Sequence, residues 1–332
     1  MLTRRRGFIL GVTALLAAPA TATAQDARRV RRIGYLSLVS GQLEQTRRWM
    51  AAFREGLRSL GYVEGRNIVV EQRYAAGSID RLPALAAELI NLQVDVLVAA
   101  PAGSARAAKN ATTTLPIVFM GEPDPVGTGL VASLARPGGN VTGLADAHSD
   151  LIPKRLELLK QVAPSANRVG VLRNAANPST APQLQTAHEA ARALGMTLVP
   201  LDVKGPGSVD IERAFAGMEA ARLGGLLVIA DPILGNHRIR IAELSIAHRL
   251  PTSGTHSGWA EAGLLMSYGS DFVDMFRRGA TLVDKILRGT RPADLPVEEP
   301  TQFELVINKR TARALGLAMP ALLLARANRI LE

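Results

Sequence analysis

Short apolar runs rich in β-branched residues alternate along this chain with longer stretches that repeat apolar residues at helical spacing. In the stretch 46–60, Trp49, Phe53 and Leu57 stand four residues apart on one helical face, and Gly61 ends the pattern. A strand–helix–strand order is typical of a parallel sheet with helices on both faces. The runs that predict strands here are 32–37, 67–74, 94–100, 116–120 and 140–144, and helices are expected at 46–60 and 80–92.

The same alternation begins again in the second half of the chain. Strands are expected at 168–174, 197–203, 225–230 and 251–255, and helices at 182–194, 209–223 and 236–249. The pattern therefore predicts the α/β class, with two Rossmann-like lobes in tandem, each built on a parallel sheet.

The C-terminal segments indicate that the chain passes between the two lobes more than once. A strand is expected at 263–269, a helix at 272–288, an extended connection at 291–300, a strand at 303–309 and a last helix at 320–331. We assign lobe 1 to residues 32–144, lobe 2 to 145–262, a return to lobe 1 to 263–296, and a crossover with the C-terminal strand and helix that complete lobe 2 to 297–332. The hinge crossovers are expected near 142–146, 259–263 and 291–298.

The N-terminus carries the features of an export signal. Three arginines at 4–6 precede an apolar run over 9–18, and Ala22-Thr23-Ala24 follows as a cleavage site, so residues 1–24 are expected to be removed. Arg5-Arg6-Gly7-Phe8-Ile9 favours a twin-arginine signal, and the general secretory route stays open. Because the apolar run is shorter than a membrane span, a protein free in the periplasm is expected.

Composition narrows the classes of partner and site. The chain has no cysteine, which excludes disulfides, thiolate metal sites and a lipid-modified cysteine. Its net charge of +10 includes the three signal arginines, and the basic residues are scattered while aromatics make up 4%, so no nucleic-acid partner is expected. One basic cluster, at positions 28, 29, 31 and 32, predicts a solvated tail over residues 25–31.

The sequence lacks the usual motifs of catalytic and metal sites. In the segment 254–258, Gly-Thr-His-Ser-Gly, the serine is one position late for a nucleophile elbow. The segment 127–132 fits only a loose dinucleotide pattern and follows the fourth strand rather than the first, so a turn is the better interpretation. The five histidines show no close ligand spacing. We therefore expect no enzyme activity, no cofactor and no metal.

Several segments identify a family by resemblance. They read RIGYL at 32–36, GLRSLGYVEGRNI at 56–68, SLARPGGNVTG at 133–143, KRLELL at 154–159, MSYG at 266–269, PTQFELVIN at 300–308 and ALGL at 314–317. In this order they resemble the ABC-transporter substrate-binding family that includes the tryptophan-binding TrpX-type proteins. The resemblance implies a type I periplasmic binding protein-like fold with a three-crossover hinge, a small amino-acid-like ligand, aromatic or branched, an ABC permease in the inner membrane as partner, and a monomer.

Candidate ligand contacts in the first lobe follow its strands. Ser37 and Ser40 end the first strand and precede a helix, where hydroxyl and free N–H groups can hold a carboxylate, although serines are also ordinary caps and turns. After the third strand the family usually carries glycine, a hydroxyl residue and proline, whereas this chain has Ala102, Gly103 and Ser104 after Pro101. Because the family's hydroxyl residue is missing, a site that binds the ligand carboxylate as in the family is in doubt. The hydroxyl of Ser104, one helical step later, could take its place.

Other candidates lie farther along the chain. Asp124, between two prolines, matches the family's aspartate-proline-valine and can either pair with a ligand ammonium or cap its own turn. In the second lobe Asn174, Asp231 and Thr255 follow strands, and Asp231 is the favoured ammonium partner although Pro232 replaces the family's usual asparagine. Tyr268 resembles the family's aromatic residue near a crossover, and it could either pack at the hinge or stack on the ligand.

The predicted mechanism is closure of the two lobes around a ligand that touches both. Two alternatives to an importer remain. In the first, the closed form is presented to a membrane sensor rather than to a permease. In the second, which is less favoured, the protein is a periplasmic α/β enzyme.

Overall fold

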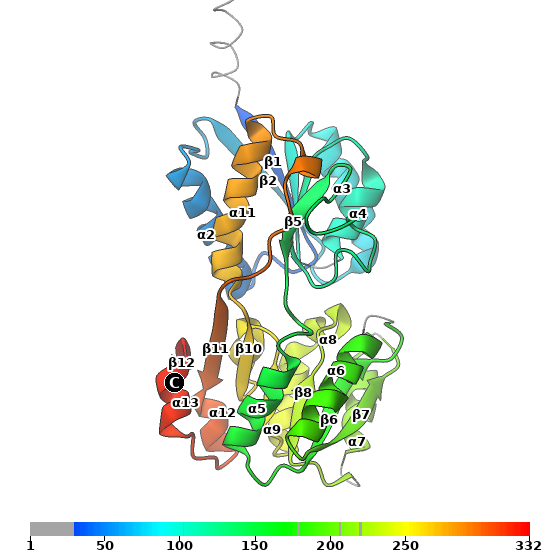
Figure 1. The fold of residues 1–332 in the computed structure, drawn as a ribbon, viewed down its shortest axis with the longest axis vertical. Helices are drawn as coiled ribbons and strands as arrows, with labels where there is room; N and C mark the ends of the chain where they lie inside the picture. The colour runs from blue at the N-terminus through cyan, green and yellow to red at the C-terminus, as the bar shows by residue number, and fades with distance from the viewer. Residues whose placement is uncertain (1–29, 102, 178–179, 206, 219–220) are drawn as a thin grey trace, which may run out of the picture.

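The computed structural model describes residues 30–101, 103–177, 180–205, 207–218 and 221–332 (Figure 1). Two α/β lobes lie one above the other along the longest axis of the molecule. The expected cleaved segment 1–24 falls outside the described residues, as does most of the expected tail 25–31.

The first lobe contains a five-stranded parallel sheet in the order β2-β1-β3-β4-β5. Its strands are β1 (Arg31–Ser37), β2 (Ile68–Tyr74), β3 (Val96–Ala100), β4 (Ile117–Glu122) and β5 (Val141–Ala145). Strands β3, β4 and β5 are buried along their whole length, as expected when helices cover both faces of a parallel sheet. Arg31, expected in the tail, is the first residue of β1, because it pairs with Ile68.

Two pairs of helices cover this sheet. α2 (Glu44–Ser59) and α11 (Phe272–Leu287) pack on one face, and α3 (Leu82–Asn91) with α4 (Ser104–Ala111) on the other (Figure 1). A Cβ atom at Gly56 would lie 2.5 Å from the Arg277 carbonyl oxygen, so a glycine allows α2 and α11 to approach closely. A helix from the last quarter of the chain therefore completes the core of the first lobe.

The second lobe contains a seven-stranded sheet in the order β12-β11-β10-β9-β8-β6-β7, with only the β10–β11 pair antiparallel. Its strands are β6 (Arg168–Asn174), β7 (Thr197–Val203), β8 (Gly225–Val228), β9 (Thr252–Gly254), β10 (Met266–Ser270), β11 (Phe303–Asn308) and β12 (Arg329–Leu331). The expectation of two lobes with mainly parallel sheets is confirmed.

Helices cover both faces of this sheet as well. α5 and α6 pack in one core cluster, while α7 and α9 pack in the other, together with Trp259. The helices of this lobe are α5 (Ile152–Val162), α6 (Thr180–Ala193), α7 (Ser208–Ala216), α8 (Pro232–Asn236), α9 (Arg238–Ala247), α10 (Ser257–Glu261), α12 (Lys309–Ala314) and α13 (Ala321–Arg326). Two short 3₁₀ helices, Ile79–Arg81 and Pro292–Asp294, lie in the first lobe.

Two expectations about the C-terminal segments were wrong. The segment 263–296 does not return to lobe 1 as a whole, because Met266–Ser270 pairs with β9 and β11 in the second sheet; the crossover expected at 259–263 therefore lies after Ser270. The last helix, expected over 320–331, ends at Arg326, and Arg329–Leu331 pairs with β11 as a strand.

Three connections between the lobes run close together at the hinge. The first connection follows β5, the second follows β10, and the third precedes β11. The Ala145 N–H donates to the Glu298 carbonyl at 2.8 Å, and the Asp271 N–H donates to the Gln302 carbonyl at 2.9 Å. Backbone hydrogen bonds therefore join the three connections. On this pairing, and because Val297 packs in a core cluster of the first lobe, we assign residues 30–145 and 271–298 to the first lobe, and the rest of the described chain to the second.

Candidate functional site

The two sheets face each other through the carboxyl ends of their parallel strands. Asn236 Nδ2, after β8, donates to the carbonyl oxygen of Gly77, after β2, at 2.9 Å. The ring centroids of Trp49 and His256 are 6.3 Å apart, although these residues belong to different lobes. Because ligands of open α/β sheets bind beyond the carboxyl ends of the strands, the candidate site lies between these two edges.

In the first lobe, the predicted serines hold loops together. The fully buried Ser37 hydroxyl donates to the Val39 carbonyl at 3.0 Å and accepts from the Val39 N–H at 3.1 Å. Ser104 Oγ, equally buried, accepts from the Leu38 N–H at 3.0 Å. Ser40 Oγ accepts from the Gln42 N–H at 3.3 Å. The contacts of Ser37 and Ser40 are those of turns, the alternative interpretation for these two residues, whereas Ser104 joins the loop after β1 to the start of α4.

The loop after β3 leads into α4. Ala102 lies outside the described residues. Gly103 has φ of 92°, which favours glycine, and precedes the first residue of α4, Ser104. The Gly103 N–H acts on the carboxyl of Glu122, at the end of β4, and lowers its pKa.

Glu122 was not among the sequence candidates, although it is an acidic residue that ends a buried strand, the signal that singled out Asp231. It is 8% exposed. Burial raises the pKa of Glu122 to about 7; Arg106 acts in the opposite direction, and Asp124 and Asp146 add to the increase.

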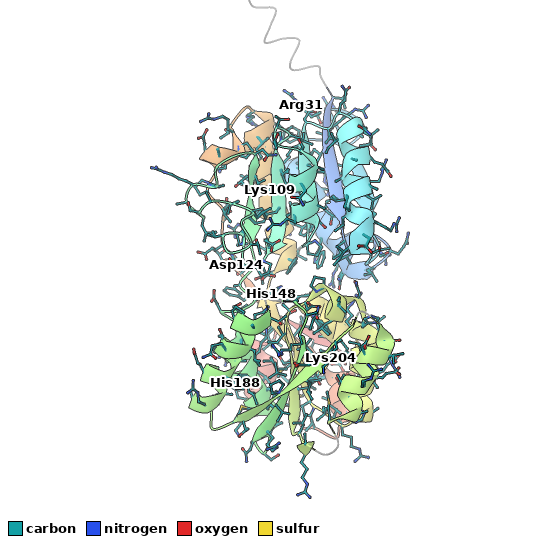
Figure 2. The ribbon with its side chains drawn as sticks, turned by 90° about the vertical axis from the view of Figure 1, so that its right-hand side faces the viewer. Arg31, Lys109, Asp124, His148, His188 and Lys204 are labelled. Carbon is teal, nitrogen blue, oxygen red and sulfur yellow. The ribbon has the colours of Figure 1, made fainter. Side chains whose placement is uncertain are left out.

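Asp124 lies at the level where the lobes meet (Figure 2). Its Oδ1 accepts from the Gly127 N–H at 2.7 Å, and its carbonyl accepts from the Thr128 hydroxyl at 2.6 Å. The exposed Asp124 side chain therefore caps its own turn, as one of the two interpretations expected. It also lines a cavity of about 210 Å³ with Asp146, Asp150 and other hinge residues.

The structure brings Asn174 and Asp231 together at the edge of the second sheet. One Asp231 oxygen accepts from the backbone N–H groups of Ile233 and Leu234, at 2.8 and 3.2 Å. The other accepts from the side-chain amides of Asn174 and Asn177, at 3.1 and 2.8 Å. Asp231 is 8% exposed and caps α8, so both of its oxygens already have donors. Its role as an ammonium partner stays a prediction.

Thr255 and Tyr268 are linked through a residue that the sequence did not single out. Arg155, on α5, is 1% exposed and donates to three carbonyl oxygens: Nε to Tyr268 at 2.7 Å, Nη1 to His148 at 2.8 Å and Nη2 to Thr255 at 3.3 Å. The Tyr268 ring lies 6.3 Å from that of Phe303, within the second core. This placement agrees with hinge packing for Tyr268.

A polar cluster lies beside this arginine at the hinge. Ser270 Oγ donates to Asp146 Oδ1 at 2.6 Å, and His148 Nε2 lies 3.0 Å from Asp146 Oδ2. Burial would raise the pKa of Asp146, but attraction to His148, hydrogen bonds from His148 and Ser270, and attraction to Arg155 lower it to about 2. The carboxylate of Asp146 lies between the serine and the histidine, whereas in a catalytic triad the histidine forms a hydrogen bond with the serine hydroxyl.

An aromatic cluster joins the two lobes near α2. Trp49 stacks on Phe272 and Phe276, with ring centroids 4.9 and 5.5 Å apart, and the ring of His256 lies 5.8 Å from Phe272. Burial lowers the pKa of His256 to about 3, and the charges of His148 and Arg238 act in the same direction. His256 is therefore neutral at physiological pH, and its Nδ1 accepts from the Gly258 N–H at 3.2 Å.

A second cavity, of about 510 Å³, lies between α10, α12 and β12 in the second lobe. Two of its polar side chains bond within the protein: Asn308 donates to the Ala260 carbonyl at 2.9 Å, and Thr311 to the Gly263 carbonyl at 2.8 Å. Among the described residues, no group of three or more His, Cys, Asp or Glu is placed to hold a metal ion. In the same part of the chain, no helix has the length and apolar character that a membrane crossing requires.

Known proteins share this architecture. A Clostridioides difficile protein named tyrosine-binding protein is 27% identical over 293 residues, which are 88% of this chain and 83% of the relative. An ABC domain from Streptococcus pneumoniae, solved with L-Trp, has a TM-score of 0.81 at 24% identity, covering 91% of this chain and 99% of that one. A ligand-free, open substrate binding protein from Clostridium difficile has a TM-score of 0.69 at 25% identity, with the same coverage.

More distant solved structures, at 11–12% identity, show that the fold is that of type I periplasmic binding proteins. The model of the family described as ABC transporter substrate binding protein matches residues 37–331, nearly the whole described chain. The family predicted from the sequence motifs is thus confirmed: this chain belongs to the ABC transporter substrate binding protein family.

Proposed function

We propose that this protein is the solute-binding component of an ABC importer and closes its two lobes around an amino-acid-like ligand, aromatic or branched. One observation carries the proposal: the carboxyl ends of two parallel sheets face each other, and contacts such as that of Asn236 with Gly77 cross between them. A ligand held there touches both lobes, so its binding favours the closed arrangement.

The ligand class is proposed from the relatives. One is named for tyrosine and another was solved with L-Trp. Aromatic residues at the lobe boundary, among them Trp49, Phe272 and His256, support a ligand with an aromatic part.

The ligand contacts are proposed to come from the loops that follow the strands. The residues are Ser37, Ser40, Ala102, Gly103, Ser104 and Asp124 in the first lobe, and Asn174, Asp231, Thr255 and Tyr268 in the second. Since Ser37 and Ser104 bond within the protein, we expect them mainly to fix the loop that the ligand touches.

Export and the partner are also part of the proposal. The arginines at 4–6 and the apolar run that follows them support export to the periplasm, where a soluble monomer would deliver its ligand to an inner-membrane permease. We propose that it does so without catalysis, and the order of Ser270, Asp146 and His148 supports this because the serine hydroxyl donates to the carboxylate, whereas in a catalytic triad it bonds to the histidine.

Calorimetry and scattering with the mature protein test this function. L-tyrosine, L-tryptophan and L-leucine are the probes, with a sugar and a nucleoside as controls. A true ligand at 100 times its Kd raises the free energy of unfolding by about 2.7 kcal/mol. It should also reduce the radius of gyration. Stabilisation by the sugar or nucleoside alone, or an unchanged radius at saturation, would contradict the proposal. Stimulation of ATP hydrolysis by the reconstituted permease separates transport from sensing.

A further inference from the structure

The backbone at the end of β4 directs Glu122 out of the regular strand. The pairing of β4 with β5 shifts between Met120 and Glu122, and Gly121 between them has φ of 82°. Such an irregularity changes the direction of the side chain that follows it. A Cβ atom at Gly121 would lie 2.8 Å from the Phe272 ring, so the conformation requires glycine. The Glu122 carbonyl accepts from the Asp146 N–H at 3.0 Å, which places Glu122 beside the hinge.

The Glu122 carboxylate lacks a cationic partner. Among the described residues, no Lys, Arg or His lies within 4.0 Å of it. Arg106 acts on it only from farther away, and its guanidinium bonds to the Thr128 carbonyl. The other charges that act on Glu122 are Asp124 and Asp146, which are negative. A carboxylate that is 8% exposed and forms no ion pair with a described residue is costly unless a positive group joins it.

The other candidate carboxylates already have their donors. Both oxygens of Asp231 are used by backbone and amide N–H groups. Asp124 is exposed and caps its own turn. Glu122 combines burial with the absence of an ion pair among the described residues, and it lies on the same sheet edge as Ser37.

The charge of Glu122 indicates which end of a ligand it faces. The Gly103 N–H, before the first turn of α4, acts on the Glu122 carboxyl by lowering its pKa, so Glu122 lies beside the start of this helix. The Glu122 charge would repel a ligand carboxylate at this position. A positively charged group fits it.

We propose that Glu122 is the residue that selects the ligand's ammonium group on the first-lobe side of the site. The inference rests on the proposed function and makes it more specific: the ligand class is one that carries a primary ammonium, and a carboxylate of the same ligand lies away from the start of α4. Ligand binding then supplies the missing counter-charge.

Calorimetry with three matched probes tests this role. L-tryptophan carries both charged groups, tryptamine lacks the carboxylate, and indole-3-propionate lacks the ammonium; tyrosine, tyramine and 3-(4-hydroxyphenyl)propionate form a second set. At pH 7.5, Glu122→Gln should weaken binding of the amino acid and the amine about 10- to 100-fold, the range of a hydrogen bond to a charged group. Binding of the propionate should stay equal or become tighter. The control variant is Glu299→Gln, which removes an exposed carboxylate near the hinge. It should change each affinity less than threefold.

Proton release gives a second measurement that does not depend on the stability of the variant. When an ammonium fixes Glu122 in its ionised form, the wild type should release protons near pH 7, and the Gln variant should release markedly fewer. Arg106, Asp124 and Asp146 are present in both proteins, so their contribution is common. Comparison of the binding enthalpy in two buffers of different ionisation enthalpy measures the difference.

The outcomes separate the two proposals. If the wild type binds tryptophan or tyrosine and Glu122→Gln binds them equally well, the role of Glu122 is wrong and the proposed function stands. If no ammonium-bearing probe binds the wild type, or only the propionates bind, both are wrong. If amines bind but amino acids do not, and the Gln variant loses the amines, Glu122 is supported and the amino-acid ligand is wrong.

Discussion

Replacement of the buried arginine tests how the second lobe is held together at the hinge. Arg155→Met keeps the length of the side chain and removes the donors to the carbonyls of His148, Thr255 and Tyr268. These three carbonyls belong to the crossover after β5, to the segment after β9 and to β10. We expect the variant to fold with a markedly less stable second lobe.

The magnitude follows from two opposing contributions. Each buried carbonyl left without a donor costs about 1–3 kcal/mol. Against this, burial lowers the pKa of Arg155 to about 10, which corresponds to a penalty of about 3 kcal/mol for holding the charge that methionine would not have. At the middle of that range, the cost of three carbonyls without donors exceeds the penalty that methionine avoids, and Asp146 also loses the attraction of the Arg155 charge. We therefore expect the free energy of unfolding to fall by about 3 kcal/mol.

The two tryptophans allow the assay to report on one lobe. Trp259 lies in the core of the second lobe and Trp49 in that of the first. In a Trp49→Phe background, urea unfolding followed by Trp259 fluorescence gives the free energy of unfolding of the second lobe. Arg168→Met is the control, because the exposed Arg168 donates to one carbonyl, that of Ala221, and should lose less than about 1 kcal/mol. A loss below about 1 kcal/mol for Arg155→Met, or a gain, would refute the reasoning.

Three further predictions address the first lobe and closure. Gly56→Ala should lower the free energy of unfolding by about 1–3 kcal/mol in urea titrations, because the new Cβ meets the Arg277 carbonyl; an unchanged value would show that α2 and α11 separate freely. Asn236→Ala removes an exposed bond to Gly77 and should weaken ligand binding less than about threefold in calorimetry, with a larger radius of gyration without ligand; a tenfold loss would contradict this. Because the pKa of Glu122 is raised in the folded protein, the unfolded chain loses this proton first, and ionisation of Glu122 destabilises the folded protein progressively between about pH 4.5 and 7. Glu122→Gln should therefore match the wild type in stability at pH 4.5 and be more stable by up to about 3 kcal/mol above pH 7. A difference in urea titrations that does not change with pH would refute the assignment.

The sequence predicted most strands because their apolar runs are local and bounded by turn residues. It could not tell which sheet a strand joins. The apolar run that became Met266–Ser270 would fit either lobe, and its pairing with β9 and β11 was decided by tertiary contacts. The end of the chain failed for a related reason: Ala321–Arg326 is helical, but Arg329–Leu331 pairs with an edge that the sequence does not reveal.

The candidate site was predicted to the level of the loops and less well to the level of side chains. Residues after strands do lie on the facing edges, because parallel strands place their carboxyl ends on one side. Whether a given polar group is free depends on partners far away in the sequence. Asp231 has both oxygens occupied, whereas Glu122, two residues before the candidate Asp124, has no ion pair in the described chain. Arg155 was missed because an arginine on a helix is ordinarily assigned to the solvent-facing side.

Contacts at the hinge and contacts across the facing edges of the lobes differ in strength. At the hinge, Arg155 and the Ser270–Asp146 pair are buried, and the backbone bond of Ala145 to Glu298 ties two crossovers together. Such bonds cost several kcal/mol to break, so they should persist in every lobe arrangement. Across the facing edges, by contrast, the bond of Asn236 is exposed, and such a contact contributes at most about 1 kcal/mol.

This difference has a consequence for ligand binding. A ligand that adds contacts to both lobes in the closed form shifts the balance between the open and closed forms toward the closed one. A buried carboxylate without an ion pair in the described chain, that of Glu122, penalises burial without a ligand and favours closure around a cation. The same charge therefore makes the empty closed form less stable and the loaded one more stable, which is what a protein that must report occupancy requires.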